Sequence, residues 1–150
     1  MDLKIHHFYD IIRDFGRGKE ILPHPYGHSY HQIARMIRDN PGIQIRLVIG
    51  PDDICEGCEM LQEGRCIDSI SHRRDFLSKE DFNDHIDRKI MKVLSLGEGD
   101  TLTPQELCLF AKSYLANIEW IYEGNDPEHT AERKKNVIAG FRYYSKLHGF

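Results

Sequence analysis

Three of the four cysteines lie within twelve residues, in the stretch IGPDDICEGCEMLQEGRC. Cys55 and Cys58 form a Cys-x-x-Cys pair, and Cys66 follows eight residues later. Thiolates hold zinc or an iron–sulfur cluster when they converge on one centre. Gly57 and Gly64 lie between the thiols, where the backbone must fold back to bring them together. The spacing therefore predicts a metal centre in this loop.

Several kinds of centre fit this pattern. With Cys108 as a fourth thiolate, the loop could hold an iron–sulfur cluster. Three or four of the cysteines, with His6 or His7, could instead hold zinc in a closed tetrahedral site. A dithiol–disulfide pair is a third reading, although the helical pattern lacks the βαβ setting of thioredoxin-like proteins. Free, buried cysteines are the fourth. We expect a metal, either zinc or iron–sulfur, and the candidate ligands are Cys55, Cys58, Cys66, Cys108, His6 and His7.

Histidines and aspartates near the cysteines offer a second chemistry. The histidines are His6, His7, His24, His28 and His31. Together with Asp52 and Asp53 they could line a pocket for acid–base or metal-assisted hydrolytic chemistry. Either aspartate could instead cap a helical turn that carries the Cys-x-x-Cys pair, which is the reading we favour for them.

Helical periodicity predicts the frame that must position these side chains. It predicts a first helix over residues 5–15, with the histidine pair in its opening turn. Ser29 and Gln32 form a capping-box pattern that starts a second helix, and Asn40-Pro41-Gly42 ends it. Because His6 and Asp10 are four residues apart, they should share one face of the first helix.

Three more helices are predicted further along the chain. Ser78 begins a helix over residues 79–95. The segment Thr103-Pro104-Gln105-Glu106 is a strong N-terminal signature, and the helix that it opens has an apolar face reaching Ile121. A final amphipathic helix runs to about His148. Together these patterns predict a compact single domain, mainly α and loosely α+β, with four to five helices, one short β element and a cysteine-bearing loop.

The β element is predicted over residues 43–49, where apolar and polar residues alternate and the chain then enters the cysteine loop. A strand needs a partner. The segment Asp2–Ile5 is one candidate, and a strand of a second subunit is the other, so a homodimer is possible on this pattern.

Composition narrows the class of protein. The chain has 24 acidic and 20 basic residues and a net charge of −4, which gives no electrostatic reason to expect nucleic-acid binding. No apolar run approaches the ~20 residues that a membrane span needs, and the N-terminus lacks a signal-peptide pattern. We therefore expect a cytoplasmic protein, in a compartment where disulfides are rare.

The sequence resembles a family of small bacterial and archaeal proteins catalogued as domain of unknown function 1284. The likeness rests on the His6-His7 pair at a helix start and on the string Gly50-Pro51-Asp52-Asp53-Ile54-Cys55 after a strand, and it covers roughly residues 5–120. Members are often labelled predicted iron–sulfur-binding or metal-binding, so the resemblance implies metal binding. It implies no known reaction.

The expectation from sequence is thus a cytoplasmic metal-binding domain over residues 1–150 that serves electron transfer, sensing or structure with an unknown protein or redox partner. Two alternatives remain open. One is a metal-assisted hydrolase that uses the N-terminal histidines, and the other is a helical interaction module stapled by zinc.

Overall fold

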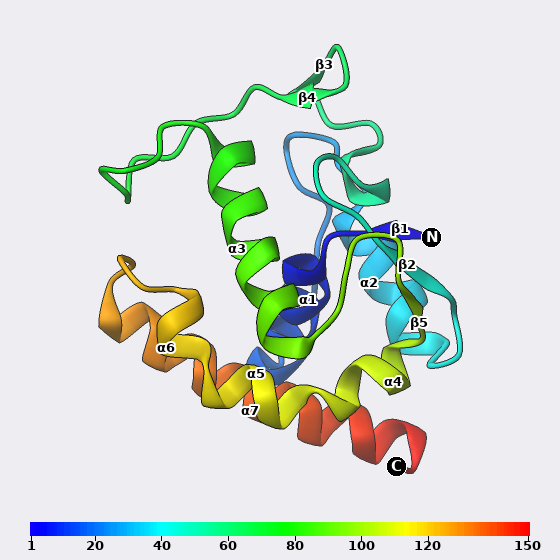
Figure 1. Ribbon diagram of the computed structural model, residues 1–150. Coiled ribbons are helices and arrows are strands. Elements are labelled where there is room, and N and C mark those ends of the chain that lie inside the picture. Colours follow the sequence, from blue (N-terminus) through cyan, green and yellow to red (C-terminus); the bar gives the residue numbers. More distant parts are fainter.

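The structure is a computed structural model that describes residues 1–150, and its elements surround helix α1 (Ile5–Arg17) (Figure 1). The other helices are α2 (Tyr30–Asp39), α3 (Lys79–Leu94), α4 (Pro104–Leu109), α5 (Ala111–Ala116), α6 (Ile118–Ile121), α7 (Pro127–His148) and the short 3-10 helix η1 (Asp53–Cys55). The strands are β1 (Asp2–Leu3), β2 (Ile45–Leu47), β3 (Leu61–Gln62), β4 (Arg65–Cys66) and β5 (Thr101–Leu102). The predicted mainly-α fold is confirmed.

Helix α1 is buried because neighbours cover most of its circumference. Its apolar side chains Ile5, Phe8 and Ile12, which set the predicted periodicity, are fully inaccessible to solvent. Helix α7 lies across one side of α1, and α3 packs on another (Figure 1). Each such side chain contributes roughly 1.5–3 kcal/mol on burial. The start of α1, which carries the histidine pair, is therefore held rigidly.

The crossing of α1 and α7 is close enough to require glycine on both helices. A Cβ on Gly140 would lie 1.8 Å from the carbonyl oxygen of Ile12, and one on Gly16 would lie 1.8 Å from that of Asn136. The two backbones are thus in direct contact, and no larger residue fits at either position.

A three-stranded sheet joins the N-terminus to the cysteine loop. Strand β1 pairs in parallel with β2, with Leu3 opposite Leu47, and β2 pairs antiparallel with β5. The predicted strand is therefore present but shorter than expected, and its partner is the Asp2 segment of the same chain. The argument for a homodimer from an unpaired strand no longer applies.

The helix-cap predictions are mostly confirmed. Thr103 and Glu106 form a complete capping box, and the Ser78 hydroxyl accepts a hydrogen bond from the Asp81 amide. The capping box at Ser29 is wrong, because the Ser29 hydroxyl donates instead to the carbonyl of Glu56 in the cysteine loop.

The single helix expected after Thr103 is also wrong, since the chain forms α4, α5 and α6. The last break falls at Asn117, where φ is −116° and the side-chain amide donates to the carbonyl of Ser113. Such a bond competes with the regular helical ladder. The breaks bend the chain around the core, so the structure has more helices than the four or five predicted.

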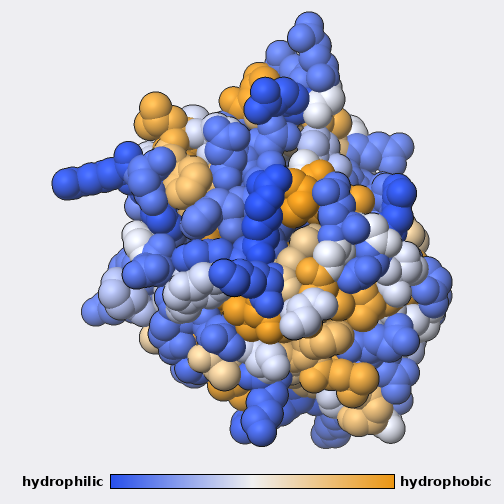
Figure 2. Space-filling view, viewed as in Figure 1, coloured by the Kyte–Doolittle hydropathy of each residue, from blue (hydrophilic) through white to orange (hydrophobic).

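Polar and charged residues cover most of the face seen in Figure 2, with smaller apolar patches between them. None of the helices combines the length and the apolar character needed to cross a bilayer.

Candidate functional site

A cavity of about 350 Å³ lies between the start of α1, the segment before α2 and the cysteine loop. It brings together three thiols and four imidazoles from four parts of the sequence. Its sulfur and nitrogen groups come from Cys55, Cys58, Cys66, His6, His7, His24 and His28. Four of the predicted site residues do not line it, namely Cys108, His31, Asp52 and Asp53.

Backbone contacts hold the cysteine loop against the segment before α2. The amide of Glu59 donates to the carbonyl of Tyr26, and the amide of Ser29 donates to that of Ile54, both at 2.8 Å. A Cβ on Gly27 would come within 2.9 Å of the carbonyl oxygen of Gly57, so the two turns touch. Gly27 and Gly57 both have positive φ, which glycine adopts without strain.

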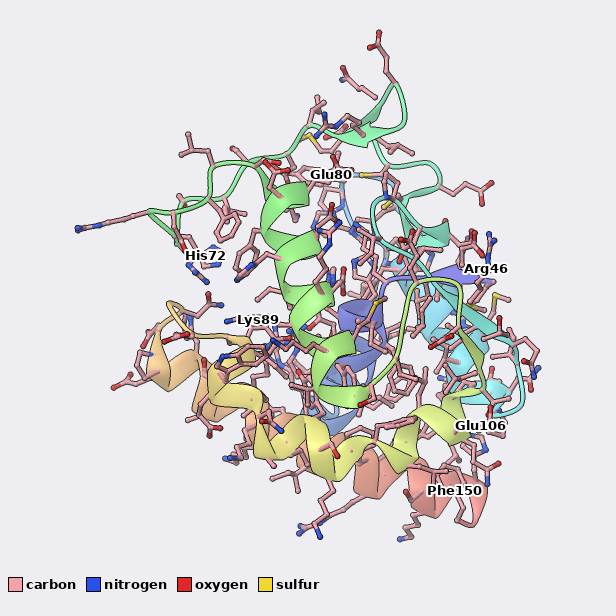
Figure 3. The ribbon with its side chains drawn as sticks, in the orientation of Figure 1. Arg46, His72, Glu80, Lys89, Glu106 and Phe150 are labelled. Atoms are coloured by element: carbon pink, nitrogen blue, oxygen red, sulfur yellow. The ribbon has the colours of Figure 1, made fainter.

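The far end of the loop is the β3–β4 hairpin, which the sequence did not predict. Its turn uses Glu63 and Gly64, both with positive φ. Glu80, at the start of α3, accepts hydrogen bonds from Arg65 Nε and from the amide of Cys66 (Figure 3). One buried carboxylate therefore places the third cysteine of the cluster.

Asp52 joins the cysteine loop to the histidine pair. Its Oδ1 accepts from the amide of Ile54 and caps η1, which confirms the predicted capping role. Its Oδ2 accepts from the amide of Lys4 at 2.8 Å and lies 2.7 Å from Nδ1 of His7. Burial alone would raise the pKa of Asp52, but His7 and the Lys4 amide outweigh it and hold that pKa well below its ordinary value.

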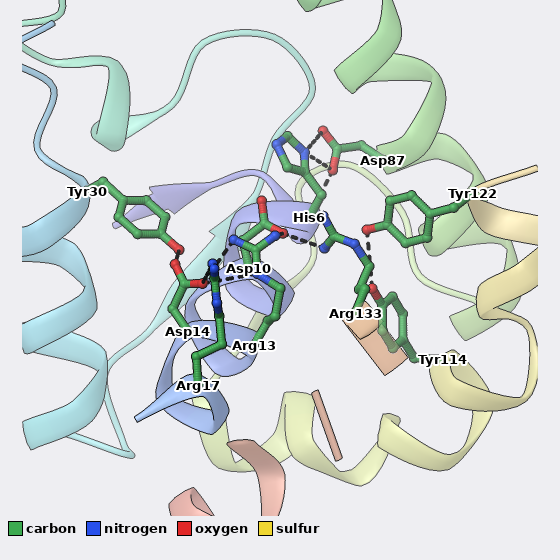
Figure 4. Close-up of polar contacts among 10 residues, drawn as sticks. All are labelled: His6, Asp10, Arg13, Asp14, Arg17, Tyr30, Asp87, Tyr114, Tyr122 and Arg133. Carbon is green, nitrogen blue, oxygen red and sulfur yellow. Dashed lines mark hydrogen bonds and ion pairs between the residues drawn. The ribbon is translucent and has the colours of Figure 1, made fainter. Parts of the chain in front are cut away.

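His6 has a similar carboxylate partner in α3. Its Nδ1 lies 2.8 and 2.9 Å from the two oxygens of Asp87, and its own amide donates to the same carboxylate (Figure 4). Asp87 is fully buried. Sequence analysis missed Asp87, although its place beside Ile86 and three residues before Ile90 puts it at the edge of a predicted apolar stripe.

These contacts assign the protons on the first pair of imidazoles. In a neutral ring, a carboxylate on Nδ1 holds the proton there and leaves the lone pair on Nε2. Neither His6 nor His7 has a hydrogen bond at Nε2, both line the cavity, and their ring centroids are 4.3 Å apart. Metal-binding histidines in proteins have this carboxylate support, and so do histidines that act as general bases.

The second pair of imidazoles has the opposite arrangement. Nδ1 of His24 accepts from the amide of Tyr26 at 3.1 Å, and Nδ1 of His28 accepts from that of Tyr30 at 3.4 Å. Their rings stack with centroids 4.4 Å apart. Burial and the neighbouring His24 lower the pKa of His28, so it stays neutral. The proton of each neutral ring is therefore on Nε2, which makes both of them donors.

A network of ion pairs forms one wall of the cavity. Asp10 pairs with both Arg133 and Arg13, and the hydroxyl of Tyr30 donates to Asp14 (Figure 4). Burial opposes ionisation of Asp10, but the two guanidinium groups outweigh it and hold its pKa well below the ordinary range. The carboxylate of Asp10 is therefore occupied by the two arginines and is not available to a metal.

None of the thiols is joined in a disulfide, and all four cysteines are free. Burial and the charge of Asp52 raise the pKa of Cys55 to about 11, and burial raises that of Cys108, on α4, to about 12. No three Cys, His, Asp or Glu side chains are close enough together in this conformation to hold a metal ion. Metal binding would therefore require loss of thiol protons and rotation of side chains.

Comparison with known proteins places the chain in a family. Residues 24–124, more than half of the sequence, match the family described as protein of unknown function (DUF1284), and the chain belongs to that family. The match includes the cysteine loop, His24 and His28, and it begins after the His6-His7 pair. Neither the curated proteins nor the solved structures gave a match.

Proposed function

We propose that the protein binds one zinc ion at this cavity through Cys55, Cys58 and Cys66, with His6 or His7 as the fourth ligand. The observation that carries the proposal is the carboxylate behind each of these two imidazoles. A buried Nδ1–carboxylate contact orients the ring and makes Nε2 a better ligand. Two such rings line the same cavity as three thiols.

The donor set favours zinc over an iron–sulfur cluster. Three sulfurs and one imidazole nitrogen are a common tetrahedral zinc set. A cluster usually takes four thiolates, and Cys108, the only remaining cysteine, does not line the cavity. The raised pKa of Cys55 also argues against a reactive dithiol pair, because the thiolate is the attacking species in disulfide exchange.

The cysteine loop is the part of the site that must change conformation to bind the metal. The three cysteines lie in η1, in a turn and in the two-residue strand β4, and they are only half-buried, so their side chains can rotate without disturbing the core. His6 and His7 are held on a rigid helix. We therefore expect the metal to order the cysteine loop against fixed imidazoles, in a reducing cytoplasm that keeps the thiols free.

The first experiment is anaerobic purification followed by elemental analysis and a visible spectrum of the same sample. We expect about one zinc per chain, in line with a single mononuclear site, and no visible absorption. Cobalt should give thiolate-to-metal absorption. Cys58→Ala should abolish it, whereas Cys108→Ala should retain it. Matching iron and sulfide would overturn the zinc assignment, and a protein without metal that binds no cobalt would overturn the proposal.

The orienting role of Asp87 has its own test. Asp87→Asn keeps the shape of the side chain but replaces the carboxylate that faces Nδ1 of His6 with a neutral amide. Loss of such a partner typically lowers metal affinity about 10- to 100-fold. Asp81→Asn, an exposed change on the same helix, should leave the affinity unchanged. Equal affinities in a folded Asp87→Asn protein would show that His6 is not the ligand.

Metal-assisted hydrolysis is a second candidate, favoured by the open cavity and by the two histidine–carboxylate pairs. If one of these imidazoles binds zinc, the other is placed to accept a proton from a metal-bound water. Zinc bound by four protein ligands, with no exchangeable water, would support a structural staple instead.

A further inference from the structure

We infer that the cavity also binds a small oxyanion, a phosphate or carboxylate group, with Lys4 as its cationic partner. This deepens the proposed function and rests on it for the metal beside the anion. The argument begins with the charges that line the cavity. Its cations are Lys4, Arg13, Lys79 and Arg133, and its carboxylates are Asp10, Asp14 and Asp68.

All of these charges except one are neutralised within the protein. Arg13 pairs with Asp10 and Asp14. Arg133 also pairs with Asp10, and Lys79 pairs with Asp68 at 2.9 Å. Lys4 alone forms neither an ion pair nor a side-chain hydrogen bond. The cavity wall thus has one cation without a counter-ion.

Lys4 is unusual because it is also buried. The residue is only 2% exposed, and its backbone is fixed at the start of α1 by the bond from its amide to Asp52. The carboxylates of Asp52 and Asp84 act on its charge through space, yet neither is in contact with the ammonium group. The ammonium group is largely withdrawn from water and has no partner, which is costly, and an anion in the cavity would offset that cost.

His24 and His28 add two more hydrogen-bond donors to the cavity. His24 and His28 accept backbone amides at Nδ1, so each presents an N–H at Nε2. Lys4 has three N–H donors and no acceptor. A phosphate or carboxylate group offers only acceptors, so it is complementary to this donor set, whereas a cationic ligand is not. The donors come from two sides of one cavity of about 350 Å³, which suits a small molecule.

A competing role for Lys4 must be separated from this one. If Cys55, Cys58 and Cys66 become thiolates on a zinc ion, the ammonium could simply balance their charge, since Lys4 already favours the thiolate of Cys55. In that case its removal would weaken metal binding. In the oxyanion site its removal would weaken anion binding and leave the metal in place.

The test is calorimetric titration of the protein, as purified with its metal, with inorganic phosphate and separately with acetate. Lys4→Met keeps the aliphatic stem and removes the charge, and we expect at least a tenfold rise in Kd for the oxyanion that binds. Lys4→Arg should restore most of the affinity. Lys112→Met, an exposed change on α5, is the matched control and should bind as the parent does. Zinc content is measured on every sample.

The outcomes separate the two proposals. Unchanged oxyanion affinity in Lys4→Met, or no binding of either probe to a protein that holds zinc, would overturn the oxyanion site and leave the metal proposal standing. Loss of zinc from Lys4→Met would assign the lysine to the thiolates and also overturn the inference. Lys4-dependent phosphate or acetate binding in a protein that takes up no metal would support the oxyanion site and overturn the zinc proposal. Preference for one probe identifies which of the two oxyanions the cavity selects.

Discussion

The α1–α7 crossing and the cysteine loop are held together by opposite means. The crossing relies on apolar burial and on backbone contact at Gly16 and Gly140. The loop, residues 50–78, contains only three buried residues, of which Asp52 and Arg73 are charged. Its shape depends on turns and on hydrogen bonds from single polar side chains. The protein thus combines a closely packed frame with a segment that is held mainly by turns and single polar contacts.

The candidate site lies where these two regions meet. His6 and His7 belong to the rigid side, since they are on α1 and are braced by the carboxylates of Asp87 on α3 and of Asp52, which caps η1. Its thiols belong to the adaptable side. We therefore expect substitutions in the frame to act on folding and substitutions in the loop to act mainly on ligand binding.

The largest effect should come from Gly140→Ala. The added Cβ would lie 1.8 Å from the carbonyl oxygen of Ile12, so α7 must move away from α1. Overpacking of this kind usually costs about 1–3 kcal/mol, and we expect the upper end or more because backbone atoms cannot rotate aside. Urea denaturation measures the change in unfolding free energy.

Gly42→Ala is the matched control for that experiment. Its added Cβ would meet only the side-chain oxygen of Asn40, at 3.7 Å. The expected change is within about 0.5 kcal/mol. A Gly140→Ala protein as stable as this control would mean that the helices are not in backbone contact.

An intermediate, pH-dependent effect is expected for Asp10→Asn, which removes the carboxylate that links α1 to Arg133 of α7. Because the pKa of Asp10 is held below its unfolded value, its ion pairs stabilise the fold at neutral pH and that contribution is lost as the pH falls. We expect about 2–3 kcal/mol of lost stability at pH 7. The difference from the parent should shrink as the pH falls below the ordinary carboxyl value of about 4.

Denaturation at a series of pH values measures this linkage. Glu98→Gln, an exposed change in the turn after α3, should match the parent throughout. If the cost of Asp10→Asn were the same at pH 3 and pH 7, the ion pairs would not be its cause.

The smallest effect on stability should come from the loop itself. Gly64 has φ +76° with no atom within 4 Å of an added Cβ, so Gly64→Ala adds backbone strain and no clash. The expected cost is about 1 kcal/mol. Gly97→Ala, at ordinary φ, should cost less. In the zinc-bound protein, Gly64→Ala should also lower the affinity for the metal, because this turn positions Cys66. If Gly64→Ala destabilised the fold as much as Gly140→Ala does, the contrast between the loop and the helix crossing would be contradicted.

The sequence predicted the parts of the structure that depend on local pattern. The mainly-α fold, the start of α1, the Asp52 cap and the capping box at Thr103 all follow from residues within a few positions of one another. The cysteine spacing also pointed to the loop that lines the cavity.

Long-range polar partners could not be predicted in this way. His6 and Asp87 are 81 residues apart, and Asp10 and Arg133 are 123 residues apart, so no periodic pattern links them. Short strands and helix breaks were missed because tertiary packing outweighs local propensity in segments of two to six residues. The protons on the histidines depend on these same distant contacts.

The packing of α7 on α1 also bears on when the site can form during protein synthesis. The histidine pair emerges from the ribosome early, but the carboxylate of Asp87 follows much later, and α7 is made after both. Until residues 127–148 have been translated, α1 lacks the helix that covers it (Figure 1). Domains generally fold as units. On the zinc proposal, metal loading would therefore follow translation of α7, because the imidazole side of the site is not packed before then.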